Sequence, residues 1–170
     1  AELFFFFFFT RLKKFNLETL EEKTKILKFT RFRKDVRACF DFLGFEFTWG
    51  VDRKGNDVIK RRTSKERLRR SLSAFKAWCR EMRNCRLRKI FSLLNAKLRG
   101  YYNYYGVIGN FSGIREFFTQ AIRILYKWLN RRSQRKSFNY RVFNEILKFY
   151  GIERPRITQQ RTHQLQLKWS

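Results

Sequence analysis

The chain has 170 residues, which is enough for one domain or for one domain and part of another. Hydrophobic residues make up 44% of it and aromatic residues 19%, which excludes a disordered basic tail and supplies apolar surface for a core. Lysine and arginine number 40 against 14 acidic residues, so the formal net charge is +26. A chain so charged repels itself unless a polyanion is bound, and the composition therefore favours nucleic acid as the partner.

An anionic membrane surface is the alternative sink for this charge. The basic residues are spread over every segment instead of forming one polybasic tether, and no apolar run is long enough to cross a bilayer. We therefore expect no membrane association. Cys39, Cys79 and Cys85 are unevenly spaced and far from the single histidine, His163, so they assemble no zinc site. Buried or incidental thiols of a reducing compartment explain them best.

The start of the chain is unusual. It begins at Ala1, its single methionine is Met82, and it lacks the basic start of a signal peptide, so we expect a C-terminal piece of a longer protein. Residues 4–9 are an unbroken phenylalanine run that fits neither an amphipathic helix nor a half-buried strand, which indicates a frame error or a degraded coding segment. Residues 10–15 then resemble the end of a helix, and residues 23–29 form a candidate strand.

A β-hairpin is predicted next. Residues 40–49 are rich in aromatic rings and read as one strand. Their apolar and other residues alternate at the two-residue period of a half-buried strand, with Leu43, Phe45, Phe47 and Trp49 on one face and Gly44, Glu46 and Thr48 on the other. Lys54-Gly55-Asn56 supplies turn chemistry, and residues 58–62 can return as the second arm.

Residues 63–151 are predicted to be helical only. Thr63 or Ser64 can cap the first helix. Its apolar residues recur every three or four positions, and a basic stripe lies about 90° round the same cylinder. The apolar positions are Leu68, Leu72, Phe75, Cys79 and Met82, and the basic ones are Arg69, Lys76, Arg80 and Arg83.

Three more helices follow. The second buries residues between Leu87 and Tyr105 and stops at Gly106 and Gly109. Ser112 can cap the third, which reaches Trp128, and residues 140–149 form the fourth. We therefore predict a mainly α fold in which a small basic helical bundle follows a partial α+β segment with a β-hairpin. The predicted divisions are residues 1–62, residues 63–151, and an irregular tail over residues 152–170.

Two basic clusters carry the functional prediction. Residues 60–70 contain a single acidic residue, Glu66, and residues 131–136 contain none. Cations are favoured at a helix C-terminus in any case, but the second cluster continues beyond the helix. Tyr104 falls off the core face of its helix and is the best candidate for a stacking or phosphate contact. The candidate RNA-binding residues are Lys60, Arg61, Arg62, Lys65, Arg69, Lys76, Arg80, Lys97, Arg99, Tyr104, Arg131, Arg132, Arg135 and Lys136.

No catalytic constellation is evident. Nucleotide transfer needs clustered carboxylates that hold two metal ions, and the only adjacent acidic pair, Glu21-Glu22, is followed by Lys23. A phosphate-binding glycine loop and a Ser/His/Asp set are also missing from the sequence. We expect no enzyme activity, no metal site and no cofactor in this chain.

The motifs LNAKLRGYYNYYG (residues 94–106) and YKWLNRRSQR (residues 126–135) resemble the maturase domain of bacterial-type group II intron-encoded reverse transcriptases. This domain is also called domain X and doubles as the polymerase thumb. Three weaker stretches resemble the same family in the same order: RLKKFNLE (11–18, with 22–24) and FDFLGF (40–45) of the polymerase palm, and IERPRI (152–157) of the closing segment.

The resemblance implies a helical thumb that binds group II intron RNA, assists splicing and contacts the template-primer duplex in a full parent enzyme that depends on Mg²⁺. It also implies a bacterial cytoplasmic location, or an organellar one. The catalytic Tyr-x-Asp-Asp box of the family would lie before Ala1, no endonuclease segment follows Ile157, and Tyr140 stands where the family commonly has tryptophan. RNA binding therefore carries over, and polymerase activity does not.

Two alternatives stay open at this point. The sequence is a truncated record of a complete RNA-directed DNA polymerase if an Asp-Asp box lies in frame upstream of Ala1. It is a decayed remnant without function if the purified chain does not unfold cooperatively.

Overall fold

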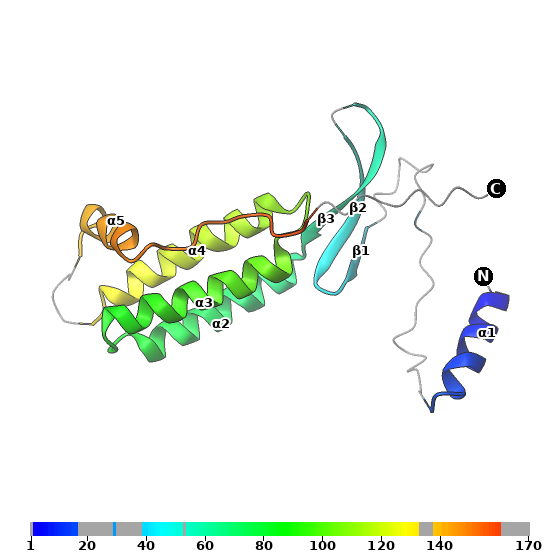
Figure 1. Ribbon diagram of the computed structural model, residues 1–170, viewed down its shortest axis with the longest axis horizontal. Helices are drawn as coiled ribbons and strands as arrows, with labels where there is room; N and C mark the ends of the chain where they lie inside the picture. Colours follow the sequence, from blue (N-terminus) through cyan, green and yellow to red (C-terminus); the bar gives the residue numbers. More distant parts are fainter. Residues whose placement is uncertain (1, 17–28, 30–38, 53, 133–137, 161–170) are drawn as a thin grey trace.

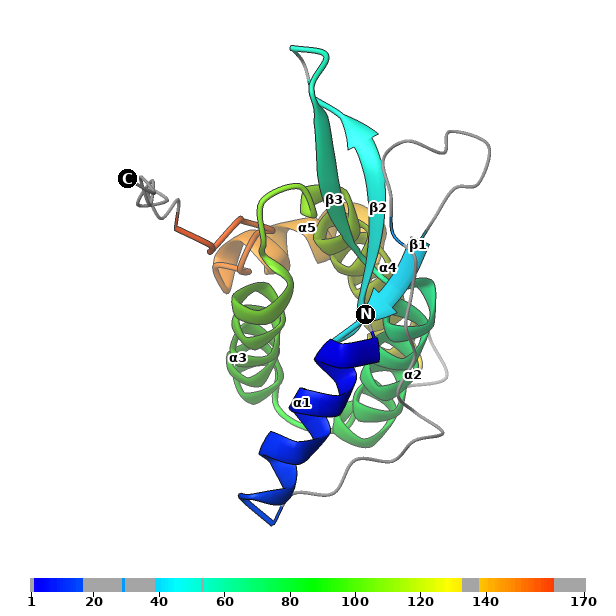
Figure 2. The ribbon, with the colours of Figure 1, turned by 90° about the vertical axis from the view of Figure 1, so that its right-hand side faces the viewer.

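The computed structural model describes residues 2–16, 29, 39–52, 54–132 and 138–160 (Figure 1). Within them the fold is helix-rich and mixed, with five helices and one three-stranded antiparallel sheet. The elements in chain order are α1 (Glu2–Lys13), β1 (Cys39–Phe42), β2 (Phe45–Val51), β3 (Asp57–Thr63), α2 (Lys65–Met82), α3 (Leu87–Tyr105), α4 (Phe111–Leu129) and α5 (Tyr140–Phe149). The helices α2, α3 and α4 run side by side, with the sheet at one end and α5 at the other (Figures 1 and 2).

The sheet has the order β1-β2-β3, so the predicted hairpin is only its second half. The prediction of one strand over residues 40–49 was wrong, because the chain reverses at Leu43 and Gly44 and Phe42 pairs with Phe45. Both turn residues have positive φ, 50° and 80°, as the tightest type of hairpin turn requires. The apolar alternation continues through this turn, so the sequence pattern does not reveal the turn.

The phenylalanine run lies in α1, a helix without an amphipathic face, so the expectation that residues 4–9 fit neither an amphipathic helix nor a half-buried strand holds while the helix itself was not foreseen. Phenylalanine has only a modest intrinsic disadvantage in a helix, so a run without amphipathic period is still compatible with helical backbone. The predicted helix end over residues 10–15 is confirmed as far as Lys13. The predicted strand over residues 23–29 lies outside the described residues, except for Phe29, which is not in a strand.

The first helix of the bundle, α2, begins as predicted. Ser64 is its N-cap, and the Ser64 hydroxyl accepts a hydrogen bond from the Arg67 backbone N–H at 3.4 Å. Phe75 and Cys79 are buried, and Leu68 and Leu72 pack at the margin of the core. The three-and-four spacing of these residues therefore identified the core face correctly.

The next two helices are joined by a short glycine-containing loop. Gly106 caps α3, as predicted, and its N–H donates to Tyr102 O. The N-cap of α4 is Asn110, so the predicted capping role of Ser112 was wrong; Ser112 lies inside the first turn. The Asn110 side chain makes no capping bond and reaches to β3 instead.

The core lies between the three long helices. Leu94, Leu98 and Ile114 are fully buried there, and Phe91 and Leu125 almost so. The fourth predicted helix is confirmed in both bounds as α5. It packs on the α3–α4 side, where Phe143 contacts Tyr126 and Tyr150 stacks on Phe91.

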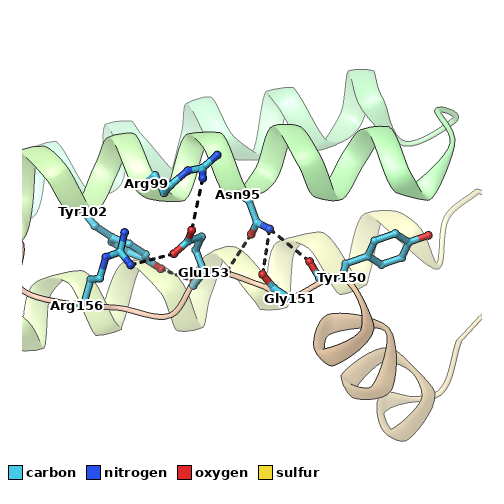
Figure 3. A network of polar contacts seen from close by, with 7 residues as sticks. All are labelled: Asn95, Arg99, Tyr102, Tyr150, Gly151, Glu153 and Arg156. Atoms are coloured by element: carbon cyan, nitrogen blue, oxygen red, sulfur yellow. Dashed lines mark hydrogen bonds and ion pairs between the residues drawn. The ribbon is translucent and has the colours of Figure 1, made fainter.

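Residues 152–160 return along α3 towards the sheet and have no regular secondary structure; we call them the return strap (Figure 1). Asn95 holds the strap where it starts, because Asn95 Oδ1 accepts the Glu153 N–H and Asn95 Nδ2 donates to Gly151 O (Figure 3). At the far end the N–H groups of Thr158 and Gln159 both donate to Gly106 O.

No helix in the described part of the chain is long and apolar enough to cross a membrane.

Candidate nucleic-acid interface

The basic stripe of α2 lies along the seam between α2 and α4. At 100° per residue, Lys65, Arg69, Lys76, Arg80 and Arg83 fall within about 60° of one another on the helix. The rise of 1.5 Å per residue makes this row about 27 Å long. Phe75 and Phe117 contact each other beneath it, with ring centroids 6.2 Å apart, and so join the two helices. Two hollows open along this α2–α4 seam.

The first hollow, of about 610 Å³, lies where the sheet meets the starts of α2 and α4, and we call it the sheet-end hollow. Arg62, Lys65 and Arg69 supply its cations. Glu46 and Glu116 also line it, so it mixes hydrogen-bond donors with carboxylate acceptors. The rest of its wall consists of the buried Thr63, of Leu68 and Leu72 of α2, and of Ser112, Gly113 and Gln120 of α4.

The second hollow, of about 780 Å³, lies at the other end of the seam, and we call it the distal hollow. It is lined by Lys76 and Arg80 of α2, by the α2 C-cap Arg83, and by Arg131, which follows α4. One carboxylate, Glu81, and the ring of Trp128 also line it. The carbons Cζ of Arg83 and Arg131 lie 5.8 Å and 5.3 Å from the centre of that ring.

The structure brings six of the predicted residues to the seam. Arg62, Lys65 and Arg69 line the sheet-end hollow, and Lys76, Arg80 and Arg131 line the distal one. Arg132 is close to the second group but points elsewhere, since its guanidinium donates to Cys85 O and ties the α2–α3 turn to the end of α4. Arg135 and Lys136 lie outside the described residues.

Four other predicted cations lie away from the seam. The Lys97 ammonium stands 5.4 Å from the Trp78 ring centre, and Arg99 pairs with Glu153 of the strap at 3.8 Å (Figure 3). Arg61 donates to Gln159 Oε1 at 2.9 Å. The side chain of Lys60 lies over Gly50 of the neighbouring strand. Lys97, Arg99 and Arg61 therefore have partners within the fold, and all four side chains lie outside the seam.

Tyr104 is half exposed but already engaged. Its hydroxyl donates to Leu43 O at 2.9 Å, and its ring stacks on Phe45 with centroids 5.9 Å apart. It therefore fastens the β1–β2 turn to α3, and its exposed edge is what remains for a ligand.

Sequence reasoning left Arg83 and Trp128 out of the candidate set. Arg83 continues the basic stripe of α2, so its spacing was a usable signal. Trp128 has the period of the α4 core, and it is only 9% exposed. Its contact with Arg83 and Arg131 requires the C-terminal ends of α2 and α4 to lie side by side. No local sequence pattern predicts that arrangement.

The largest titration shifts lie in the interior, while in the exposed β2–β3 turn the hydrogen bond that Asp52 accepts from the Asn56 N–H lowers the pKa of Asp52. Burial raises the pKa of the Cys79 thiol to about 12, against a smaller opposite effect of Lys97. Burial also raises the pKa values of Tyr101, Tyr102 and Tyr105 above the ordinary range of tyrosine. These neutral groups belong to the core and not to the seam.

In residues 2–16, 29, 39–52, 54–132 and 138–160, no group of three or more His, Cys, Asp or Glu side chains is arranged to hold a metal ion. Comparison with family models, curated proteins and solved structures found no match for the chain.

Proposed function

We propose that this chain binds folded RNA along the α2–α4 seam, as the helical RNA-binding part of a group II intron maturase, and is not itself catalytic. The observation that carries the proposal is the row of α2 cations with a hollow at each end. Its length of about 27 Å lets it contact several phosphates of one backbone segment. The formal net charge of +26 supplies the long-range attraction for a polyanion.

The hollows favour a folded polyanion over a flat anionic surface. A membrane is bound by basic side chains that project from a convex or planar face, together with apolar residues that insert. At the seam, the cations Lys65, Arg69, Lys76 and Arg80 border concave spaces instead. Glu46, Glu116 and Gln120 add acceptors, which suit the 2′-hydroxyl and base edges of RNA.

The assignment to maturases depends on the resemblance of residues 94–106 and 126–135. Leu94, Leu98 and Tyr102 of the first motif are fully buried, and Asn95 holds the return strap. The first motif therefore stabilises the helical bundle, while the cations that would contact RNA lie along the seam. Together they support a thumb-like RNA-binding module.

The test is equilibrium binding of the chain to a group II intron RNA and to an unrelated structured RNA over a range of salt. We expect log affinity to fall with log salt, by about 0.7 to 0.9 per phosphate neutralised. The seam variant replaces Lys65, Arg69, Lys76 and Arg80 with glutamine. It should weaken binding and flatten the slope by about three units.

The control variant is Arg141→Gln with Lys148→Gln, which removes exposed charge from α5, on the α3–α4 side. It should leave the slope nearly unchanged. Equal competition by tenfold excess of the unrelated RNA would remove maturase specificity from the proposal. Unchanged RNA binding by the seam variant would contradict the proposal that RNA binds along the seam.

A further inference from the structure

The distal hollow is more one-sided in charge than the sheet-end hollow. Lys76, Arg80, Arg83 and Arg131 line it together with one carboxylate, Glu81. The sheet-end hollow has two carboxylates among three cations. Over the described ranges the ion pairs within 4.0 Å involve Glu66, Glu145 and Glu153, and none includes a cation of the distal hollow.

Trp128 contacts the two arginines through the face of its ring. A guanidinium over the face of an aromatic ring is attracted to the ring without a hydrogen bond to a carboxylate, so its N–H groups can donate to another acceptor. A carboxylate partner would occupy those same N–H groups. The contact therefore holds Arg83 and Arg131 in place and keeps their donors available for an anion.

The same contact makes Trp128 a poor stacking platform. The residue is 9% exposed, and two guanidinium groups lie near its ring. A nucleobase needs an open aromatic face to stack on. Arg83 and Arg131 also lie at the C-terminal ends of α2 and α4, where the helix dipoles stabilise cations and offset the repulsion between them.

We propose that the distal hollow is a phosphate pocket, in which Arg83 and Arg131 bind a phosphate group, Lys76 and Arg80 flank it, and Trp128 positions the arginines. The inference rests on the proposed function in one respect, because bound RNA is the source of the phosphate. The pocket recognises the phosphate backbone and carries no base preference.

The first experiment uses inorganic pyrophosphate and the full chain, with the indole N–H signals of the four tryptophans as the readout. Trp128→Phe identifies the Trp128 signal. We expect saturable movement of that signal with pyrophosphate, and loss of the movement in Arg83→Gln/Arg131→Gln. The control variant Arg141→Gln/Lys148→Gln should respond as the unmodified chain does. A Trp128 signal that stays still, or that moves equally in the arginine variant, overturns the pocket.

The second experiment separates positioning from packing at Trp128. Trp128→Phe retains an aromatic face and should keep pyrophosphate affinity within about threefold, since phenylalanine is the weaker cation–π partner. Trp128→Leu should lose about tenfold while its thermal unfolding stays cooperative. Equal affinity of the Phe and Leu variants contradicts the positioning role. If Trp128→Leu does not fold, Trp128→Phe still tests the positioning role. A loss of pyrophosphate affinity well beyond threefold in a folded Trp128→Phe variant would contradict that role.

The RNA experiment keeps this inference separate from the proposed function. Arg83→Gln/Arg131→Gln should lower the salt slope by about 1.4 to 1.8 for every RNA sequence tested. An abasic substitution in the RNA should leave the contribution of these arginines unchanged. If this variant binds RNA with an unchanged salt slope, the phosphate pocket is contradicted while the seam proposal stands. Pyrophosphate binding without any RNA binding removes the seam proposal and leaves the pocket.

Discussion

Asn110 holds Thr63 at two atoms, although 47 residues separate them. Asn110 Oδ1 accepts the Thr63 N–H at 2.9 Å, and Asn110 Nδ2 donates to Thr63 Oγ1 at 2.8 Å. The same Nδ2 donates to Tyr105 O at 2.8 Å. Asn110 is completely buried, so these bonds replace water and join the end of β3, the end of α3 and the start of α4.

Asn110→Ala should destabilise the fold strongly. The substitution leaves buried groups of Thr63 and Tyr105 without partners, and we expect a loss of about 3 kcal/mol in the free energy of unfolding. Urea denaturation followed by circular dichroism measures it. Asn103→Ala, at an exposed position of α3, is the matched control and should change stability by less than about 0.5 kcal/mol. Similar stabilities of the two variants would contradict this role of Asn110.

Two helical glycines should respond in opposite directions. A Cβ at Gly113 would lie 2.5 Å from Asn110 Oδ1, which the two bonds to Thr63 hold in place. Gly113→Ala should therefore destabilise the fold by about 2 kcal/mol, as expected when a buried hydrogen bond is displaced. A Cβ at Gly100 meets nothing within 4 Å, so Gly100→Ala should stabilise α3 by up to about 1 kcal/mol. Thermal melts of the two variants give the signs directly.

Alkaline pH should destabilise the fold through its buried thiol. The pKa of Cys79 rises from its ordinary 9.0 to about 12 in the folded chain, so above pH 9 the unfolded thiol ionises and the folded thiol does not. The free energy of unfolding should then fall by about 1.4 kcal/mol per pH unit for this group. The buried tyrosines add the same effect above pH 10.

Urea titrations at pH 8, 9 and 10 test this dependence. Cys79→Ala should flatten the decrease between pH 9 and pH 10, and Cys39→Ala, at an exposed position, should not. An unmodified chain that is equally stable at pH 8 and pH 10 would show that burial of the thiol has no such effect.

The thiols should also differ in their reactivity towards alkylating agents. The thiolate is the reacting form, so the raised pKa and burial of Cys79 both protect it, whereas Cys39 is exposed. At pH 8 we expect Cys39 to react at least about a hundredfold faster than Cys79, because the rise in the pKa of Cys79 from 9.0 to about 12 lowers its thiolate fraction by more than that factor. Peptide mass spectrometry after timed alkylation measures the two rates. Comparable rates would mean that α2 opens readily.

Loosening the return strap should expose it to protease. Asn95→Ala removes the acceptor of the Glu153 N–H and the donor to Gly151 O. We expect a loss of about 2 kcal/mol and faster tryptic cleavage after Arg156, because cleavage requires the strap to leave α3. Arg156→Ala is unsuitable as a control, since it removes the cleavage site. Asn103→Ala serves instead and should keep the original rate.

The helices were predictable because their apolar residues repeat along one face. The period from Leu68 to Met82 located the core side of α2, and Gly106 and Ser64 marked helix ends with the residue types that those positions require. α5 was predicted in both bounds for the same reason. Each of these signals is local, so one sequence contains it.

The errors arose where distant residues decide. The Leu43-Gly44 reversal interrupts an aromatic alternation that reads as one strand, and pairing with β2 stabilises it. The N-cap of α4 is Asn110 and not Ser112, and the Asn110 side chain accepts a hydrogen bond from the distant Thr63 N–H. The pairing of Arg99 and Arg61 with the strap was also not foreseen, because the course of the strap along α3 has no local signal.

The strap also bears on how the chain reaches its native state. Gln159 accepts a hydrogen bond from Arg61, 98 positions earlier, and from Ile108 N–H in the loop between α3 and α4. Contacts this far apart in the chain form late and slow the search for the native topology. A nascent chain that has reached Tyr150 can assemble its helices but still leaves the Gly106 carbonyl without the two amides that it accepts. We therefore expect the strap to close over α3 after the helices have formed, because Gly106 and Arg61 must both be in place to receive it.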